Sequence, residues 1–458
     1  MERKRRLGAY LIFWGMLHLC PGSAAASPAG KSAPADDGAH RARTESVESG
    51  TAAPTTADDK TAPESPEADT PNAPNFPDTT TPVSGNTRRA RKFVHRLGAE
   101  LRPEYVAPTH SFLSGRNHAH KRMTFALSEH LKYSFRFAPG SRSDRIFGGV
   151  YQGFGLARYG FGNPDELGSP IAVYLFQGAR IARISRRLSF GYEWNFGLSF
   201  GWRPSDPERN PANQVMGSKT NAYLNADFYL DWRISPRLDL NAGLTLTHFS
   251  NGNTAIPNLG LNTLGAKVGL VYNFGLPAPP DANAEPDGFR PVFPRHMCYD
   301  LVFFGSWRRK GVPDSTGALI ASPDTYTVVG FNFSALYNLG YKFRAGLSLD
   351  GVYDGSANVY TENYTDFYRP SPGEQLALGV SARGEFVMPY FTVGLGLGVN
   401  ILHRGGDLKS FYQMLTLKIA ATRRIFIHIG YCLQDFQMPN YLMLGAGFRF
   451  NDKYPRLR

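Results

Sequence analysis

Three polar side chains carry the strongest chemical signal in this chain of 458 residues: His248, Ser250 and Asn262. A serine hydroxyl becomes a nucleophile when a nearby imidazole accepts its proton and a third group orients that imidazole. His248 and Ser250 are two positions apart, so they share one face of an extended strand. These residue types in this pattern are typical of acyl transfer, provided that the neighbouring elements bring Asn262 to the same place.

The alternation of apolar residues predicts that all three side chains share one face. In Leu238–Leu246 every second residue is leucine or alanine, and the same parity continues to His248 and Ser250. In Leu264–Phe274 the apolar parity, followed backward, includes Asn262. The three side chains are therefore expected together on the apolar face of two adjacent strands, near a connecting loop. The alternative is that the parity slips at the strand end and leaves them in an ordinary solvated loop.

The strands that would position these residues belong to a chain dominated by the same alternation. Asn221–Arg233 has an apolar and a mostly polar face, and Ser189–Trp202 has aromatic or aliphatic residues at every second position. Both exceed the roughly 5–6 residues of an average soluble strand and suit the roughly 9–11 of a membrane strand. The pattern predicts an all-β, transmembrane antiparallel β-barrel, with its apolar face toward lipid. A spanning helix needs about 20 apolar residues, and no such run follows the N-terminal region.

The periodicity predicts sixteen strands. They start near Leu97, Leu131, Val150, Pro170, Leu188, Asn221, Leu238, Asn262, Met297, Thr325, Tyr341, Glu374, Tyr390, Phe411, Ile425 and Tyr441. An even number fits bacterial barrels, and fourteen strands remain if the first two segments form a plug or a periplasmic element. The last strand, Tyr441–Phe450, should end in the periplasm, which makes the short turns periplasmic and the long loops extracellular. His248 and Ser250 then lie at an extracellular strand end.

The N-terminal region indicates an exported protein. Residues 1–26 combine a basic start, an apolar stretch and three alanines, which predicts a signal peptide; lipidation at Cys20 is the less favoured alternative. Residues 27–92 are rich in Pro, Ala and Thr and predict a disordered linker, whose basic end is better explained as solvated than as a nucleic-acid contact. A long connection then separates one barrel half at 93–274 from a second at 275–458.

The segment around the histidine resembles a known family. His248-Phe249-Ser250-Asn251 is similar to the H-x-S-N signature of the PagL-type lipid A 3-O-deacylases, and the likeness continues through the acyloxyacyl hydrolase pattern HFSNGN and PNLGLN. It implies that Ser250 is the nucleophile, that His248 is the general base, and that the backbone amides of Asn251 and Gly252 stabilise an oxyanion. The family has a glutamate at the third position, where this chain has Asn262.

The resemblance covers roughly 97–274 and implies an outer-membrane esterase that hydrolyses acyl chains of lipid A or a related glycolipid. It implies no metal and no organic cofactor. Lipopolysaccharide in the outer membrane is the expected partner, and a substrate for the outer wall must arrive sideways through the membrane. The formal net charge of +12 is compatible with an anionic lipid. The alternative from another class is a catalytically silent barrel that serves as a porin, a transporter or a structural protein.

Other chemically suggestive residues carry less weight. The pair His118 and His120 could hold a metal, but an isolated H-x-H in a loop usually binds none. Cys298 and Cys432 could form a disulfide only if their geometry allows it. By parity, the following acids are expected to point into the barrel lumen and away from the candidate site: Glu193, Asp227, Asp231 and Asp239.

Overall fold

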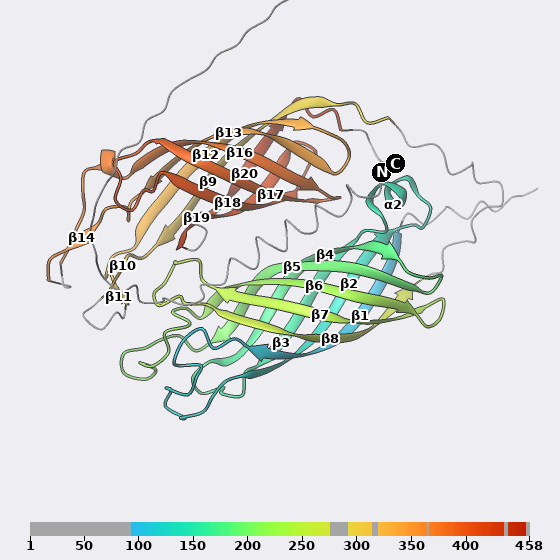
Figure 1. Ribbon diagram of the computed structural model, residues 1–458, viewed down its shortest axis with the longest axis horizontal. Coiled ribbons are helices and arrows are strands. Elements are labelled where there is room, and N and C mark those ends of the chain that lie inside the picture. The colour runs from blue at the N-terminus through green and yellow to red at the C-terminus, as the bar shows by residue number, and fades with distance from the viewer. Residues whose placement is uncertain (1–92, 275–291, 314–318, 364–365, 435–437, 455–458) are drawn as a thin grey trace, which may run out of the picture. The chain divides into compact units, whose positions relative to one another are not determined.

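Alternating apolar and polar residues build two closed antiparallel barrels in the computed structural model of this chain (Figure 1). The structure describes residues 93–274, 292–313, 319–363, 366–434 and 438–454. The expected signal peptide at 1–26 and linker at 27–92 lie outside these residues.

The first barrel contains eight strands that pair in chain order and close by pairing of the last strand with the first. Its strands are β1 (Phe93–Val106), β2 (Phe125–Phe137), β3 (Tyr151–Gly160), β4 (Gly168–Arg183), β5 (Leu188–Trp202), β6 (Thr220–Arg233), β7 (Leu238–Ser250) and β8 (Leu261–Phe274). A short helix, α2 (Arg142–Phe147), lies between β2 and β3. We call the end with segments 107–124, 203–219 and 251–260 the loop end, and the end with segments 138–150, 184–187 and 234–237 the turn end.

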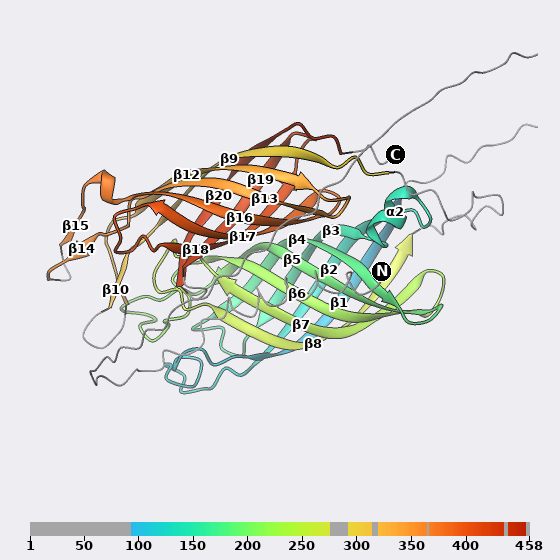
Figure 2. The same cartoon turned by 45° about the horizontal axis from the view of Figure 1, so that its top comes forward.

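The second barrel also closes with eight strands, in the order β12-β13-β16-β17-β18-β19-β20-β9 (Figure 2). They are β9 (His296–Arg308), β12 (Tyr326–Asn338), β13 (Phe343–Asp354), β16 (Leu376–Val387), β17 (Phe391–Leu402), β18 (Phe411–Ala420), β19 (Ile425–Gln434) and β20 (Met438–Phe450). The loops contain two small ribbons, β10 (Gly311–Pro313) with β11 (Leu319–Ala321) and β14 (Tyr360–Thr361) with β15 (Phe367–Tyr368), and the 3₁₀ turn η2 (Pro372–Glu374).

The predicted fold class is confirmed, with a difference in how the strands close. The sixteen long strands and their antiparallel order agree with the sequence pattern, and β1 and β2 belong to the wall, not to a plug. They form two barrels of eight strands each, where we expected two halves of one larger barrel. The reason is physical: alternation fixes the two faces of each strand but contains no information about which distant strand completes the ring, here β8 against β1.

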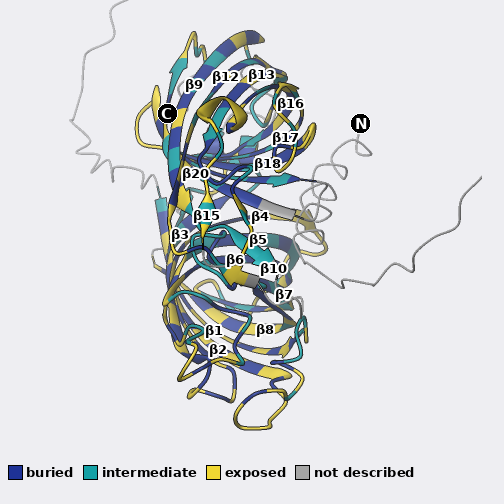
Figure 3. Cartoon of the chain, turned by 90° about the vertical axis from the view of Figure 1, so that its left-hand side faces the viewer, coloured by how far each residue is buried: buried dark blue, intermediate teal, exposed yellow. Residues whose placement is uncertain are grey.

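Buried and exposed residues alternate along the strands of both barrels (Figure 3). Leu101, Leu244 and Phe303 are among the most exposed side chains on the outer faces, at 55%, 65% and 63% of their surface. A continuous outward apolar face of this kind is the surface that a barrel presents to lipid. Within the part of the chain that the structure describes, no helix is long and apolar enough to cross a membrane.

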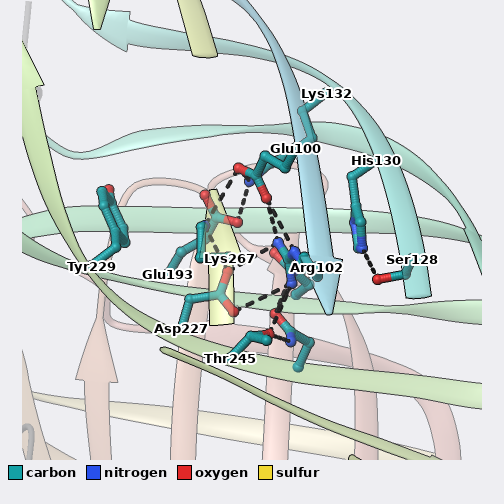
Figure 4. Close-up of polar contacts among 12 residues, drawn as sticks. Glu100, Arg102, Ser128, His130, Lys132, Glu193, Asp227, Tyr229, Thr245 and Lys267 are labelled. Carbon is teal, nitrogen blue, oxygen red and sulfur yellow. Dashed lines mark hydrogen bonds and ion pairs between the residues drawn. The ribbon is translucent and has the colours of Figure 1, made fainter. Parts of the chain in front are cut away.

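A network of buried ion pairs fills the middle of the first lumen (Figure 4). The Arg102 guanidinium contacts Glu100 at 2.6 Å and Asp227 at 3.0 Å, and it is fully buried. Lys267 bridges the same two carboxylates, and Lys132 pairs with Glu100 and with Glu193. The prediction that these acids point inward is therefore confirmed for Glu193 and Asp227, and Asp239 likewise pairs inside with Arg96 at 3.6 Å.

The second lumen also contains ion pairs. Asp300 receives hydrogen bonds from Lys418 at 2.8 Å and from Arg449 at 2.7 Å, and Arg383 pairs with Asp350 at 2.6 Å. Cys298 and Cys432 are both buried, and both are free thiols. The disulfide that the sequence left open is therefore not formed.

Candidate functional site

His248 and Asn262 meet across the seam between β7 and β8 at the loop end. They are direct partners in the β-ladder, and His248 Nδ1 lies 2.6 Å from Asn262 Oδ1. An amide oxygen can only accept a hydrogen bond, so Nδ1 must donate and the lone pair must lie on Nε2. Asn262 thereby selects the tautomer in which the imidazole can accept a proton at Nε2.

Phe249, between the two candidate catalytic residues, anchors this strand end in the lumen. Its side chain is fully buried, and its ring lies 4.9 Å from that of Trp202 and 5.0 Å from that of Tyr159, in edge-to-face contacts. Because successive residues of a strand point to opposite sides, an inward Phe249 turns His248 and Ser250 to the outer face of the sheet. His248 and Ser250 therefore share the outer face, and Asn262, the ladder partner of His248, lies on the same face.

Glu104 of β1 fastens the lumen side of the same seam. Its Oε2 accepts hydrogen bonds from Thr247 and Thr263, the ladder partners next to the pair of His248 and Asn262. Its other oxygen accepts a hydrogen bond from Ser128 at 2.8 Å. This carboxylate therefore supports the histidine from behind, through the wall. Glu104 was not identified from the sequence. The only signal in the sequence was that Glu104, Thr247 and Thr263, on three different strands, all have the parity of lumen-facing residues.

The loop that follows Ser250 covers the imidazole. Gly260 has a φ of 72°, and a Cβ there would lie 3.1 Å from His248 Cε1, so this position requires glycine both for its backbone and for space. The Asn251 N–H donates to Asn258 Oδ1 at 2.9 Å. One of the two amides proposed for the oxyanion is therefore already engaged, while Gly252, with a φ of 64°, lies in a turn.

Ser250 is the last residue of β7 and is half-buried, opposite Ala222 of β6. Among the residues that the structure describes, its hydroxyl makes no hydrogen bond with His248, whose side-chain bond is to Asn262. Two residues along a strand separate Cα atoms by about 7 Å, which side-chain rotation can bridge. The structure thus joins His248 to Asn262 and places Ser250 on the same face, without a hydrogen bond between Ser250 and His248.

A second contact between a serine and a histidine lies in the lumen, unforeseen from the sequence. Ser128 Oγ is 3.0 Å from His130 Nε2, and His130 Nδ1 is 2.9 Å from the Tyr174 hydroxyl (Figure 4). Both residues are almost fully buried, and the Ser128 hydroxyl donates to Glu104. Because the Ser128 hydroxyl already donates its hydrogen bond to a carboxylate inside the lumen, we assign this contact to the structural network of the lumen and not to a second catalytic pair.

The pair His118 and His120 lies in the loop 107–124. The structure contains no group of three or more potential metal ligands among the residues it describes. The backbone N–H groups of His118 and Ala119 instead donate to Glu166. Burial raises the pKa of Glu166, but these bonds, together with one from Asn163, outweigh that effect and hold the pKa below its usual value. The carboxylate thus fastens one loop to another at the loop end.

Two family profiles match the chain. Residues 130–271 match the family described as lipid A 3-O-deacylase (PagL), and residues 297–452 match the acyloxyacyl hydrolase C-terminal domain of PagL. The second match extends to the second barrel, beyond the residues 97–274 that the resemblance in the sequence covers. No curated protein matches the chain.

Solved barrels are similar only at a coarse level. Neisserial surface protein A is 12% identical, with a TM-score of 0.26 over 40% of this chain and 99% of its own. The outer membrane protein Omp33 of Acinetobacter baumannii is 10% identical, with a TM-score of 0.16 over 79% of this chain and 100% of its own. These scores are too low to support any conclusion about activity.

Proposed function

We propose that this chain, which belongs to the PagL family of lipid A 3-O-deacylases, is an outer-membrane esterase that hydrolyses an acyl ester of lipid A or a related glycolipid. The observation that carries the proposal is the contact of 2.6 Å between His248 Nδ1 and Asn262 Oδ1. It leaves the basic nitrogen of His248 available on the strand face that also holds Ser250. A soluble substrate would have little access to a lipid-facing site, so a membrane lipid is the substrate class that suits it.

The reaction begins when Ser250 Oγ attacks the ester carbonyl carbon and its proton passes to His248 Nε2. The tetrahedral oxyanion that forms needs donors, and the Gly252 N–H is the better of the two candidates because the Asn251 N–H already bonds to Asn258. Collapse of the intermediate breaks the bond to the sugar oxygen, which takes the proton from His248. Water then hydrolyses the acyl-enzyme by the same route.

Asn262 holds the imidazole but cannot neutralise it. The amide oxygen accepts the Nδ1 proton and fixes the ring, which is the orienting part of the third residue's role. A carboxylate would in addition stabilise the imidazolium that forms as Ser250 attacks. The reaction proposed here is therefore slower than that of a relative with glutamate at this position.

A second candidate function is a catalytically silent barrel. Two observations favour it: asparagine stands where the family has glutamate, and among the described residues Ser250 forms no hydrogen bond with His248. A porin is the least suitable form of this alternative, because ion pairs such as Arg102 with Asp227 fill the lumen of the first barrel.

Mass spectrometry of lipid A from cells with and without the protein tests the proposal. The expected result is loss of one acyl chain in its presence, abolished by Ser250→Ala and by His248→Ala. Matched controls are Ser114→Ala and His118→Ala, which truncate exposed side chains in another loop of the loop end. Equal barrel assembly in all variants must accompany the result. Intact lipid A with the wild-type protein, at normal assembly, would favour the silent barrel.

A further inference from the structure

A cavity of about 390 Å³ opens at the turn end of the first barrel, opposite the end that holds Ser250. It lies between the barrel wall and the segment that contains α2, and its volume is in the roughly 300–1,000 Å³ range of small-ligand sites. Five arginines line it: Arg96, Arg136, Arg180, Arg183 and Arg233. Only two carboxylates, Asp144 and Asp231, share the lining, which leaves an excess of three formal positive charges.

Several of these guanidinium groups lack counter-charges. Arg136, Arg180 and Arg183 form no ion pair with any residue that the structure describes. Arg96 is 6% exposed, and its one ion pair among the described residues is with Asp239, at 3.6 Å. Arg96 Nε is buried without a hydrogen-bond partner among the described residues, as is Arg136 Nε. Asp231 Oδ1 and Asp239 Oδ1 are also buried without a hydrogen-bond partner among the described residues, so donors and acceptors are both left open here. An unsatisfied buried donor costs free energy, and an acceptor atom of a ligand would satisfy these two Nε groups.

The wall of the cavity holds Arg96 in a fixed place. Its guanidinium carbon lies 4.8 Å from the centre of the Tyr151 ring, a cation–π contact, and the Tyr151 hydroxyl bonds to Tyr229 and Glu193. Arg96 is therefore anchored on one side and unsatisfied on the other. This arrangement differs from the middle of the lumen, where Arg102 is fully paired with acids.

We propose that this cavity binds a phosphate-bearing ligand. Guanidinium groups match phosphate oxygens with paired N–H donors, and a phosphate offers more oxygens and more charge than a single carboxylate. Arg136 and Arg180, on β2 and β4, would contact the phosphate from two sides, with Arg96 beneath. Inorganic phosphate and the headgroup of a phospholipid share this chemistry. The site is separate from the His248 site and does not depend on the esterase proposal.

Isothermal titration of the full-length protein in dodecyl maltoside tests the inference. The probes are inorganic phosphate, the short-chain lipid dihexanoyl phosphatidylglycerol, and acetate as a carboxylate control. We expect saturable binding of phosphate or of the lipid, weakened at least about tenfold by Arg136→Gln and by Arg180→Gln, since a charge-assisted bond is lost. Neither arginine has a carboxylate partner among the described residues, so neither variant leaves a buried acid unpaired.

Arg187→Gln is the matched control, because it removes the same charge from an exposed turn at the same end without lining the cavity. Binding that survives in Arg187→Gln and is lost in the two cavity variants supports the site. Binding of phosphate alone identifies the free ion as sufficient, and binding of the lipid alone identifies the headgroup. The inference is overturned if neither probe binds, if acetate binds equally well, or if Arg187→Gln weakens binding as much.

Discussion

Replacing Asn262 by aspartate should raise the deacylation rate. The side chain keeps its length, so the contact of 2.6 Å to His248 Nδ1 survives and gains a negative charge. A hydrogen bond to a charged group contributes about 1.5–3 kcal/mol and a neutral one about 0.5–1.5 kcal/mol. If the difference of about 1–1.5 kcal/mol is realised only when His248 becomes an imidazolium, kcat/KM should rise about tenfold.

The assay is release of fatty acid from defined lipid A by purified protein, followed by mass spectrometry. Asn262→Glu restores the residue of the family and should also raise the rate, although its extra methylene must be accommodated across a short contact. Asn262→Ala should lower kcat/KM, but by less than His248→Ala. The matched control is Gln214→Glu, which adds the same charge to another loop of the loop end, segment 203–219, and should have little effect. The orienting role of Asn262 is refuted if Asn262→Asp and Asn262→Ala both leave kcat/KM unchanged in an active protein.

Three further predictions concern the scaffold. Arg102→Met leaves Glu100 and Asp227 short of a buried partner and should destabilise the first barrel by about 3–5 kcal/mol, measured as a lower urea midpoint; an unchanged midpoint would contradict the role of the network. The pKa of Glu166 in the folded protein is held below its usual value near 4.5. The stability that the ionised carboxylate contributes is therefore complete above pH 4.5 and is lost as the pH falls through the lower pKa of the folded state. Protease cleavage of segment 107–124 should rise in that acidic range, and Glu166→Gln should show it already at pH 7. Residues 93–274 alone should form a barrel with heat-modifiable mobility on gels, since β8 already pairs with β1; dependence on the second barrel would refute independent closure.

Strand positions were predictable because each strand contains its own signal. The alternation in Asn221–Arg233 corresponds to β6 (Thr220–Arg233), and the strand expected from Leu188 is β5, which begins at that residue. The same local logic predicted that His248 and Asn262 share one face of two adjacent strands, because parity follows from each strand alone. Their pairing as direct ladder partners comes from the structure.

Contacts between distant segments were not predictable. Ring closure by β1 and β8 joins residues far apart in the sequence, and nothing in either strand identifies the other as its partner. Glu104 contacts Thr247 and Thr263 across more than a hundred residues, so its role depends on that closure. The bond from the Asn251 N–H to Asn258 depends on the path of a loop, which alternation does not describe.

The wall of the first barrel is a single β-sheet, so side chains in its lumen can influence the position of side chains on its outer face. Glu104 lies in the lumen, and it accepts hydrogen bonds from Thr247 and Thr263, the ladder pair next to His248 and Asn262. A substitution of a residue that faces the lumen can therefore move the imidazole without placing any new group in lipid. The position of His248 could thus be tuned by substitutions of lumen-facing residues, where polar and charged side chains are already accommodated.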